Sequence, residues 1–196
     1  MGAVEAAVAA LRAGEPVVLP TDTVYGLCAD AESDEACRRA VALKGRPEKQ
    51  LAALVCADVD GLLERVPEVP EALVRALLPG PYTLVLENPE RRYPWLADAT
   101  IGVRVPELPR VAAEVVRKVG ALMATSANAH GGPDPRMLED VPEQIRAGCG
   151  ALVDGGELPG VPSTVLDLTG DEPRVLREGA VPALEALASV TRARHQ

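Results

Sequence analysis

Hydroxyl and cationic side chains in this sequence gather beside short apolar stretches. Thr21 and Thr23 follow the apolar run 16–19, and Lys44 stands where a predicted helix ends. Arg104 lies within an apolar stretch, so it must find an anion or line a cleft, because burying an unpaired cation is costly. Any one cluster has an ordinary explanation, such as a self-bonding turn, a cation at a helix C-terminus or a salt bridge. Several together favour a ligand site at one edge of an α/β sheet.

Familiar nucleotide and hydrolase motifs are missing from the sequence. It has no G-x-x-x-x-G-K-[ST], no G-x-G-x-x-G and no G-x-S-x-G segment. The cysteines and histidines lack zinc-site spacing, which predicts reduced thiols at Cys28, Cys37, Cys56 and Cys149 and no metal role for His130 and His195. A phosphate compound would therefore have to be bound by other means.

The composition is that of one globular domain, or at most two small ones. The 196 residues are 47% hydrophobic and 25% charged, with no apolar run long enough to span a membrane and no secretory signal. The formal net charge of −9 and the absence of Phe argue against bulk attraction of nucleic acid and against a base-stacking platform. A local basic cleft remains compatible with this charge. We expect a cytoplasmic protein with no membrane contact.

Alternating helical and strand patterns predict an α/β fold. Helices are predicted at 4–13, 34–43, 70–78, 111–119 and 182–190. Short strands are predicted at 16–19, 51–56, 82–86, 101–105, 121–124, 151–153, 164–168 and 174–176. The connections are not uniformly strand–helix–strand, so we expect a mixed sheet covered by helices.

Seven motifs in a fixed order give the sequence a family resemblance. They are Pro-Thr-Asp-Thr-Val-Tyr-Gly-Leu (20–27), Lys-Gly-Arg-Pro (44–47), Pro-Gly-Pro-Tyr-Thr-Leu-Val-Leu (79–86), Gly-Val-Arg-Val-Pro (102–106), Thr-Ser-Ala-Asn (125–128), Pro-Ser-Thr-Val-Leu-Asp (162–167) and Leu-Arg-Glu-Gly (176–179). Together they resemble the YrdC/TsaC-like threonylcarbamoyl-AMP synthases over about residues 5–180. The resemblance implies one YrdC-like domain over residues 1–196, with a twisted mixed sheet flanked by helices and an open, positively lined cleft.

The resemblance also implies an activity. Such enzymes form threonylcarbamoyl-AMP and pyrophosphate from L-threonine, bicarbonate or CO2, and ATP with Mg²⁺. The product serves the N6-threonylcarbamoyl modification of adenosine 37 in tRNA. Neither step needs a protein nucleophile, because the protein has to position the reactants and neutralise phosphate charge.

Site residues follow from the resemblance motif by motif. The catalytic set carried over is Lys44, Arg46, Ser126 and Asn128. The expected L-threonine contacts are Thr23, Arg104, Ala124 and Ser163, with Arg104 on the carboxylate. The expected ATP contacts are Arg46, Thr100, Ser126 and Arg177.

Four further residues have no settled role from the motifs. Either Lys49 or Gln50 could take a nucleotide contact, because the usual K-P-L segment is replaced here. Asp134 stands where many relatives have Ser, and its carboxylate would repel phosphate unless a metal intervened. For Asp22 we favour a turn-capping role over a supporting role in catalysis.

Two other functions remain as alternatives. The same cleft could serve a double-stranded RNA-binding or ribosome-maturation module, although the net charge of −9 weighs against it. A carbamoyl-transfer role in hydrogenase maturation belongs to much larger proteins. For the synthase, we expect an open cleft, a separate tRNA threonylcarbamoyl transferase that takes up the product, and weak or indirect tRNA binding, because the sequence leaves no length for a covering segment.

Overall fold

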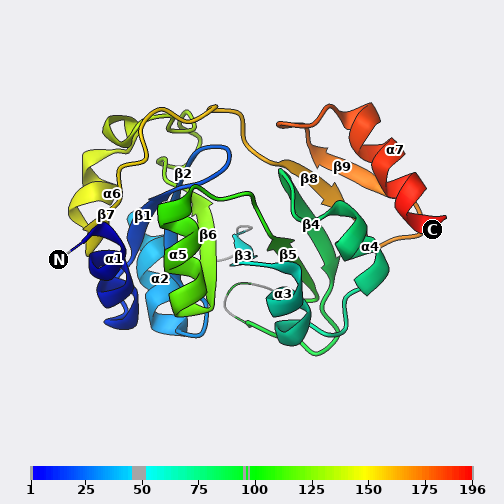
Figure 1. Cartoon of the computed structure of the whole chain (residues 1–196), viewed down its shortest axis with the longest axis horizontal. Coiled ribbons are helices and arrows are strands. Elements are labelled where there is room, and N and C mark those ends of the chain that lie inside the picture. The colour runs from blue at the N-terminus through cyan, green and yellow to red at the C-terminus, as the bar shows by residue number, and fades with distance from the viewer. Residues whose placement is uncertain (1, 46–51, 95, 97, 196) are drawn as a thin grey trace.

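Nine strands form one sheet within the part of the chain that the computed structural model describes, residues 2–45, 52–94, 96 and 98–195 (Figure 1). The strands are β1 (Val17–Pro20), β2 (Tyr25–Asp30), β3 (Ala53–Cys56), β4 (Tyr82–Glu87), β5 (Thr100–Arg104), β6 (Ala121–Ser126), β7 (Ala151–Leu152), β8 (Thr164–Asp167) and β9 (Arg174–Arg177). Their order is β7-β1-β2-β6-β3-β5-β4-β8-β9. The pairs β1/β7, β3/β5 and β4/β8 are parallel and the others antiparallel, which confirms the predicted mixed sheet.

Helices pack on this sheet in two groups, seen at the left and right of Figure 1. They are α1 (Ala3–Arg12), α2 (Asp34–Leu43), α3 (Val59–Arg65), α4 (Glu71–Leu77), α5 (Arg110–Val119), α6 (Glu143–Ala147) and α7 (Ala183–Arg194), with a 3₁₀ turn at Leu138–Asp140. The chain begins beside the left group and ends beside the right one, at opposite ends of the molecule.

The helix groups divide the core into three clusters. The first packs α1 and α5 on one face of β1, β2 and β6 through residues such as Leu11, Val115 and Leu122. The second packs α2 and α6 on the opposite face of those strands through Ala40 and Leu27, among others. The third packs α3, α4 and α7 on β3, β4, β5 and β8. One face of β4, β5 and β8 is therefore left for a ligand site.

Helix ends follow the local sequence signals closely. The Ser33 side chain accepts a hydrogen bond from the Ala36 amide and caps α2. Gly14 and Gly45 follow α1 and α2 with φ of 75° and 67°, a backbone region that glycine enters without a β-carbon clash. The predicted stops of these two helices are thereby confirmed.

Some elements differ from the sequence-based expectation. The hydroxyl-rich motif 20–27 suggested only a turn, but its last residues begin the strand β2. The sequence does not reveal this strand, because residues 25–29 are all buried and polar and apolar residues do not alternate along it. The short helices α3 and α6 had no clear signal. The strand β6 extends to Ser126, two residues beyond its predicted end, because it pairs with β2 up to Gly26. No helix in the described ranges is long and apolar enough to cross a membrane.

Candidate functional site

An open cleft occupies the sheet face that α3, α4 and α7 do not cover. Its volume is about 290 Å³, and its walls come from β2, β3, β4, β5, β6, β8 and β9 and from the loop after β1. The predicted cleft is thus present. It lies over the strand faces as well as at their ends, so several strand residues point into it directly.

Small residues form the floor of the cleft. Ala124 of β6 pairs with Ala53 of β3, and Ala53 pairs with Gly102 of β5, which places the three residues in one row across the sheet. All three line the cleft, as does Gly26 of β2. Because larger side chains are missing along this row, space remains above the sheet for a ligand.

Lys44 and Ser126 form a hydrogen-bond network on the β6 side of the cleft. Lys44 is the C-cap of α2 and only 3% exposed. Its Nζ donates to Thr125 Oγ1 at 3.0 Å, to the Ser126 carbonyl at 2.5 Å and to Ser126 Oγ at 3.1 Å. The Ser126 hydroxyl donates to Asn128 Oδ1 at 2.7 Å, and Asn128 Nδ2 donates to the Gly132 carbonyl at 2.6 Å. Three members of the predicted catalytic set are therefore physically connected.

Arg104 forms an ion pair with Asp22 at the end of β5. Arg104 Nη2 lies 2.8 and 3.1 Å from the two carboxylate oxygens, and the two side chains are 11% and 9% exposed. The Thr23 hydroxyl donates to Asp22 Oδ1 at 3.3 Å. Arg104 Nε is buried and has no hydrogen-bond partner among the described residues. Asp22 therefore orients the guanidinium, and Nη1 of Arg104, which has no hydrogen bond to a described residue, is left for an anionic group.

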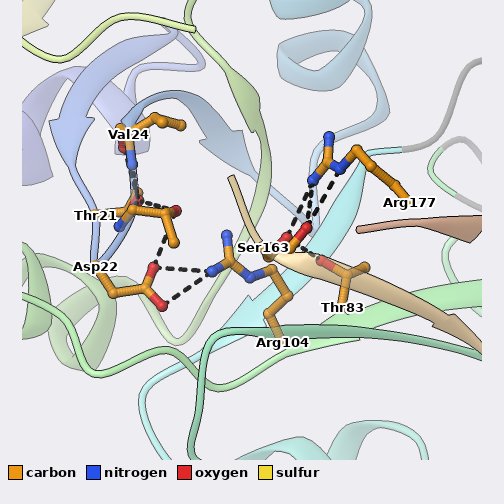
Figure 2. A network of polar contacts seen from close by, with 8 residues as sticks. Thr21, Asp22, Val24, Thr83, Arg104, Ser163 and Arg177 are labelled. Atoms are coloured by element: carbon orange, nitrogen blue, oxygen red, sulfur yellow. Dashed lines mark hydrogen bonds and ion pairs between the residues drawn. The ribbon is translucent and has the colours of Figure 1, made fainter. Parts of the chain in front are cut away.

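Arg177 and Ser163 form the opposite wall. The Arg177 guanidinium donates to the Ser163 carbonyl at 2.9 and 3.3 Å and to Ser163 Oγ at 3.2 Å, and the Ser163 and Thr83 hydroxyls lie 2.8 Å apart. Figure 2 shows Arg104 between Asp22 on one side and this group on the other. The cleft therefore presents two arginine side chains from different strands.

The surroundings of Arg177 lower the pKa of its guanidinium. Partial burial lowers the pKa of its guanidinium, and the nearby positive charge of Arg104 lowers it further, whereas the negative charge of Asp134 raises it. A bound anion would offset the positive charge of Arg104 that Arg177 faces. The electrostatics of the cleft therefore favour an anionic ligand.

A long connection between β7 and β8 delivers Ser163 to the cleft and passes along the top of Figure 1. The buried Tyr25 anchors it, because the Tyr25 hydroxyl donates to the Gly156 carbonyl at 2.8 Å and accepts from the Gly155 amide at 2.9 Å. Further along, the Gly160 amide donates to the Thr23 carbonyl at 2.8 Å. The connection is thus tied to the motif that carries Thr23.

The structure brings most of the predicted site residues together. The cleft is lined by Thr23, Arg104, Ala124, Ser126, Ser163 and Arg177, and Lys44 and Asn128 bond to Ser126. Thr100 is exposed at the start of β5 and does not line the cleft, although it shares a strand face with Gly102 and Arg104. Arg46, Lys49 and Gln50 lie outside the described residues.

Two residues of the site have a place that the motifs did not indicate. Thr83 lines the cleft, and its signal was the unused Tyr-Thr-Leu-Val-Leu segment of one motif. Asp22 does more than cap a turn, since it pairs with a residue 82 positions away. Neither partnership could be inferred without the strand order.

The site has the donors for an anion but not the ligands for a resident metal. Among the described residues, no group of three or more His, Cys, Asp or Glu side chains could hold a metal ion, and Asp22 is already paired with Arg104. The cysteines are free, as predicted, and burial raises the pKa of Cys28, Cys37, Cys56 and Cys149 to about 12 each. The thiols are therefore protonated at neutral pH, which makes them weak nucleophiles.

Comparison with known proteins now decides the family. The family model Sua5_yciO_yrdC, described as "Telomere recombination", matches residues 9–179. The chain belongs to this family. A Mycobacterium tuberculosis family member, provisionally named threonylcarbamoyl-AMP synthase, is 37% identical over 190 residues, which cover 94% of this chain and 87% of that protein. The Bacillus subtilis threonylcarbamoyl-AMP synthase is 35% identical over 183 residues, covering 89% of this chain and 53% of that enzyme.

A solved structure extends the Sua5/YciO/YrdC relationship to the fold. Pyrococcus abyssi Sua5, described as complexed with L-threonine, matches with a TM-score of 0.85 and 34% identity, covering 95% of this chain and 56% of that one. The chain thus spans most of the mycobacterial relative but only about half of the Bacillus and Pyrococcus family members. The predicted YrdC-like fold and the classification among threonylcarbamoyl-AMP synthases, which are tRNA-modifying nucleotidyltransferases, are confirmed.

Proposed function

We propose that the cleft forms threonylcarbamoyl-AMP and pyrophosphate from L-threonine, bicarbonate or CO2, and ATP, as one catalytic unit over residues 1–196. The observation that carries this proposal is the convergence of Arg104, Arg177 and the Ser126 hydroxyl, which the buried Lys44 holds in place, around one small-residue floor. Cations, hydroxyls and an open floor suit a substrate set with a carboxylate and a triphosphate. The family relationship supports the same reaction.

We assign the threonine end of the cleft to Arg104. Its guanidinium, oriented by Asp22 through Nη2, receives the threonine carboxylate through Nη1. Thr23 and Ser163 stand on either side of it, and Ala124 offers main-chain contact from the floor. The described complex of a relative with L-threonine supports an amino-acid subsite in this fold.

We assign the ATP end to the network of Lys44, Ser126 and Asn128. The buried Lys44 fixes the end of β6, so that the Ser126 hydroxyl is held where phosphate oxygens can approach. Arg177 neutralises phosphate charge from the opposite wall. Thr100 lies two residues before Gly102, on the same face of β5, and extends this surface toward the rest of the nucleotide. Arg46 completes the set as a prediction.

The chemistry needs positioning more than a protein nucleophile. The uncharged threonine amine attacks CO2 and loses a proton to give a carbamate. A carbamate oxygen then attacks the α-phosphate of ATP and pyrophosphate leaves with the electrons of the broken P–O bond. Lys44 and Arg177 stabilise the charge that builds on the phosphates. Magnesium enters bound to ATP, because the described residues of the cleft include no cluster of carboxylates that would bind it.

The product is taken up by a separate tRNA threonylcarbamoyl transferase, and tRNA contacts this chain weakly or indirectly. The formal net charge of −9 supports this, because a polyanion is repelled by most of the surface. The cations of the cleft lie in a space of about 290 Å³, which suits a small substrate better than a duplex.

Pyrophosphate release from ATP tests the function. We expect release that needs both L-threonine and bicarbonate, with free threonylcarbamoyl-AMP detected by mass spectrometry. Omission of either substrate is the control. RNA binding with a steep salt dependence and no threonine-dependent turnover would instead identify an RNA-binding module. Tight tRNA binding at physiological salt would contradict the proposed division of labour with a transferase.

A further inference from the structure

Thr83 is a residue of the cleft that the proposed roles leave unused. It lies on β4, half-buried, and lines the cleft. Leu84 pairs with Val103, so the preceding residue of β4 stands beside Arg104 at the end of β5. On its other side, Thr83 Oγ1 lies 2.8 Å from Ser163 Oγ. Thr83 therefore stands between the proposed carboxylate-binding arginine and a proposed threonine contact.

Counting protons shows that this hydroxyl pair has one donor to spare. Thr83 and Ser163 carry two hydroxyl protons, and the bond between them uses one. Ser163 Oγ already accepts from Arg177 at 3.2 Å, which favours donation from Ser163 to Thr83 in a polarised chain. The Thr83 proton is then left for an acceptor that no described side chain provides. A ligand oxygen in the cleft would satisfy it.

Apolar side chains stand directly next to this donor. Val85, two residues along β4, and Val165, which pairs with Thr83 on β8, both line the cleft. A hydroxyl donor beside two valine side chains is complementary to a group that carries one hydroxyl and one methyl. The side chain of L-threonine is such a group.

We propose that Thr83 is a specificity-determining residue that donates a hydrogen bond to the side-chain hydroxyl of L-threonine, while Val165 packs against its methyl group. This inference rests on the proposed function, because it assumes an L-threonine subsite at Arg104. A site that hydrogen-bonds a hydroxyl rejects analogues that lack it more strongly than analogues that lack a methyl group. Valine is then a poorer ligand than serine.

Dissociation constants for L-threonine, L-serine and L-valine, measured by calorimetry on the full chain, test the proposal. Thr83→Val keeps the shape and removes the hydroxyl, so it should weaken threonine and serine by about tenfold or more and leave valine within about twofold. Val165→Ala should weaken threonine and valine but leave serine unchanged. Thr83→Ser should restore the threonine affinity. Thr191→Val, on the exposed face of α7, is the matched control.

The outcomes separate the two proposals. Equal weakening of all three amino acids by Thr83→Val would place its hydrogen bond on a group that they share, and would overturn the inference while the synthase function stands. Normal threonine binding without pyrophosphate release would count against the function and leave the Thr83 assignment intact. No threonine binding by the wild-type chain would overturn both. Thermal melting of each variant confirms that it is folded.

Discussion

The two halves of the sheet differ in how many of their faces the helices cover. The strands β1, β2 and β6 are enclosed by α1 and α5 on one face and by α2 and α6 on the other. The strands β4, β5 and β8 have helices α3, α4 and α7 on one face only, and their other face forms the cleft. One continuous sheet thus serves as a core on one side and as a binding platform on the other.

Side-chain size along one sheet face accounts for this difference. Cys28 and Leu122 project from β2 and β6 into the cluster beneath α1 and α5. On the same face, Ala53 and Gly102 leave no comparable apolar surface to bury, so no helix is held over them. The comparison teaches that removal of side chains from a sheet face creates the site, while polar groups at its rim give it chemistry.

The largest expected effect is a loss of stability when a core side chain is shortened in the enclosed half of the sheet. Leu27 of β2 is fully buried, and Leu27→Ala should lower the free energy of unfolding by about 2–5 kcal/mol through lost burial and a cavity. Leu176→Ala removes the same side chain from the cleft wall, where it is 51% exposed, and should cost no more than about 0.5 kcal/mol. Urea unfolding measures both. Equal losses would mean that the cleft wall is as tightly packed as the core.

Loss of the buried cation at the end of α2 should lower activity far more than loss of an exposed cation. Lys44→Ala should lower pyrophosphate release at least about 100-fold, because a preorganised cation next to developing phosphate charge supplies a few kcal/mol. Arg46→Ala is expected to do the same. The exposed Lys118, paired with glutamates on the outer surface, provides the control in Lys118→Ala. Near-normal turnover in a folded Lys44 variant would remove this lysine from the mechanism.

A methyl group added to the floor should separate activity from stability. A β-carbon on Gly102 would lie 3.4 Å from the Ala52 carbonyl oxygen and 3.5 Å from the Thr83 methyl carbon, which is ordinary contact. Gly102→Ala should therefore change the unfolding free energy by less than about 1 kcal/mol. Because the methyl group occupies ligand space, turnover should fall about tenfold. Melting curves measure the stability and initial rates measure the turnover. Unchanged turnover would show that the ligand does not reach this floor.

The smallest expected effect is on the pH dependence of stability, and it comes from Asp167 on β8, near the edge of the sheet. Hydrogen bonds from Thr169 and the charge of Arg174 lower the pKa of Asp167. The folded carboxyl is then the stronger acid, so its stabilisation is complete above the unfolded pKa of about 3.9 and is lost as the pH falls through the folded value. Asp167→Asn should flatten the acid side of the stability profile by at most about 1 kcal/mol. An unaltered slope between pH 5 and 2 would contradict this.

Local signals in the sequence were sufficient for several elements and for the residue types of the site. Helices α1, α2 and α5 are marked by local features of the sequence. These are the Ser33 cap, the glycines after α1 and α2, and the apolar period of α5. The motif order indicated the family, and with it Lys44, Ser126 and Asn128 as one set. These features depend on neighbours within a few residues, so a sequence reveals them.

The tertiary structure alone decided which of these residues meet. Arg104 pairs with a residue 82 positions away and Thr83 with one 80 positions away. Both pairs depend on the strand order β1-β2-β6-β3-β5-β4-β8, which no local pattern specifies. Even the strand β2 could not be predicted from the sequence. A strand that is buried on both faces shows no alternation of polar and apolar residues, and it forms because β1 and β6 pair with it on either side. Strand order follows from burying the largest apolar surface of the whole chain, a global free energy that no single segment carries.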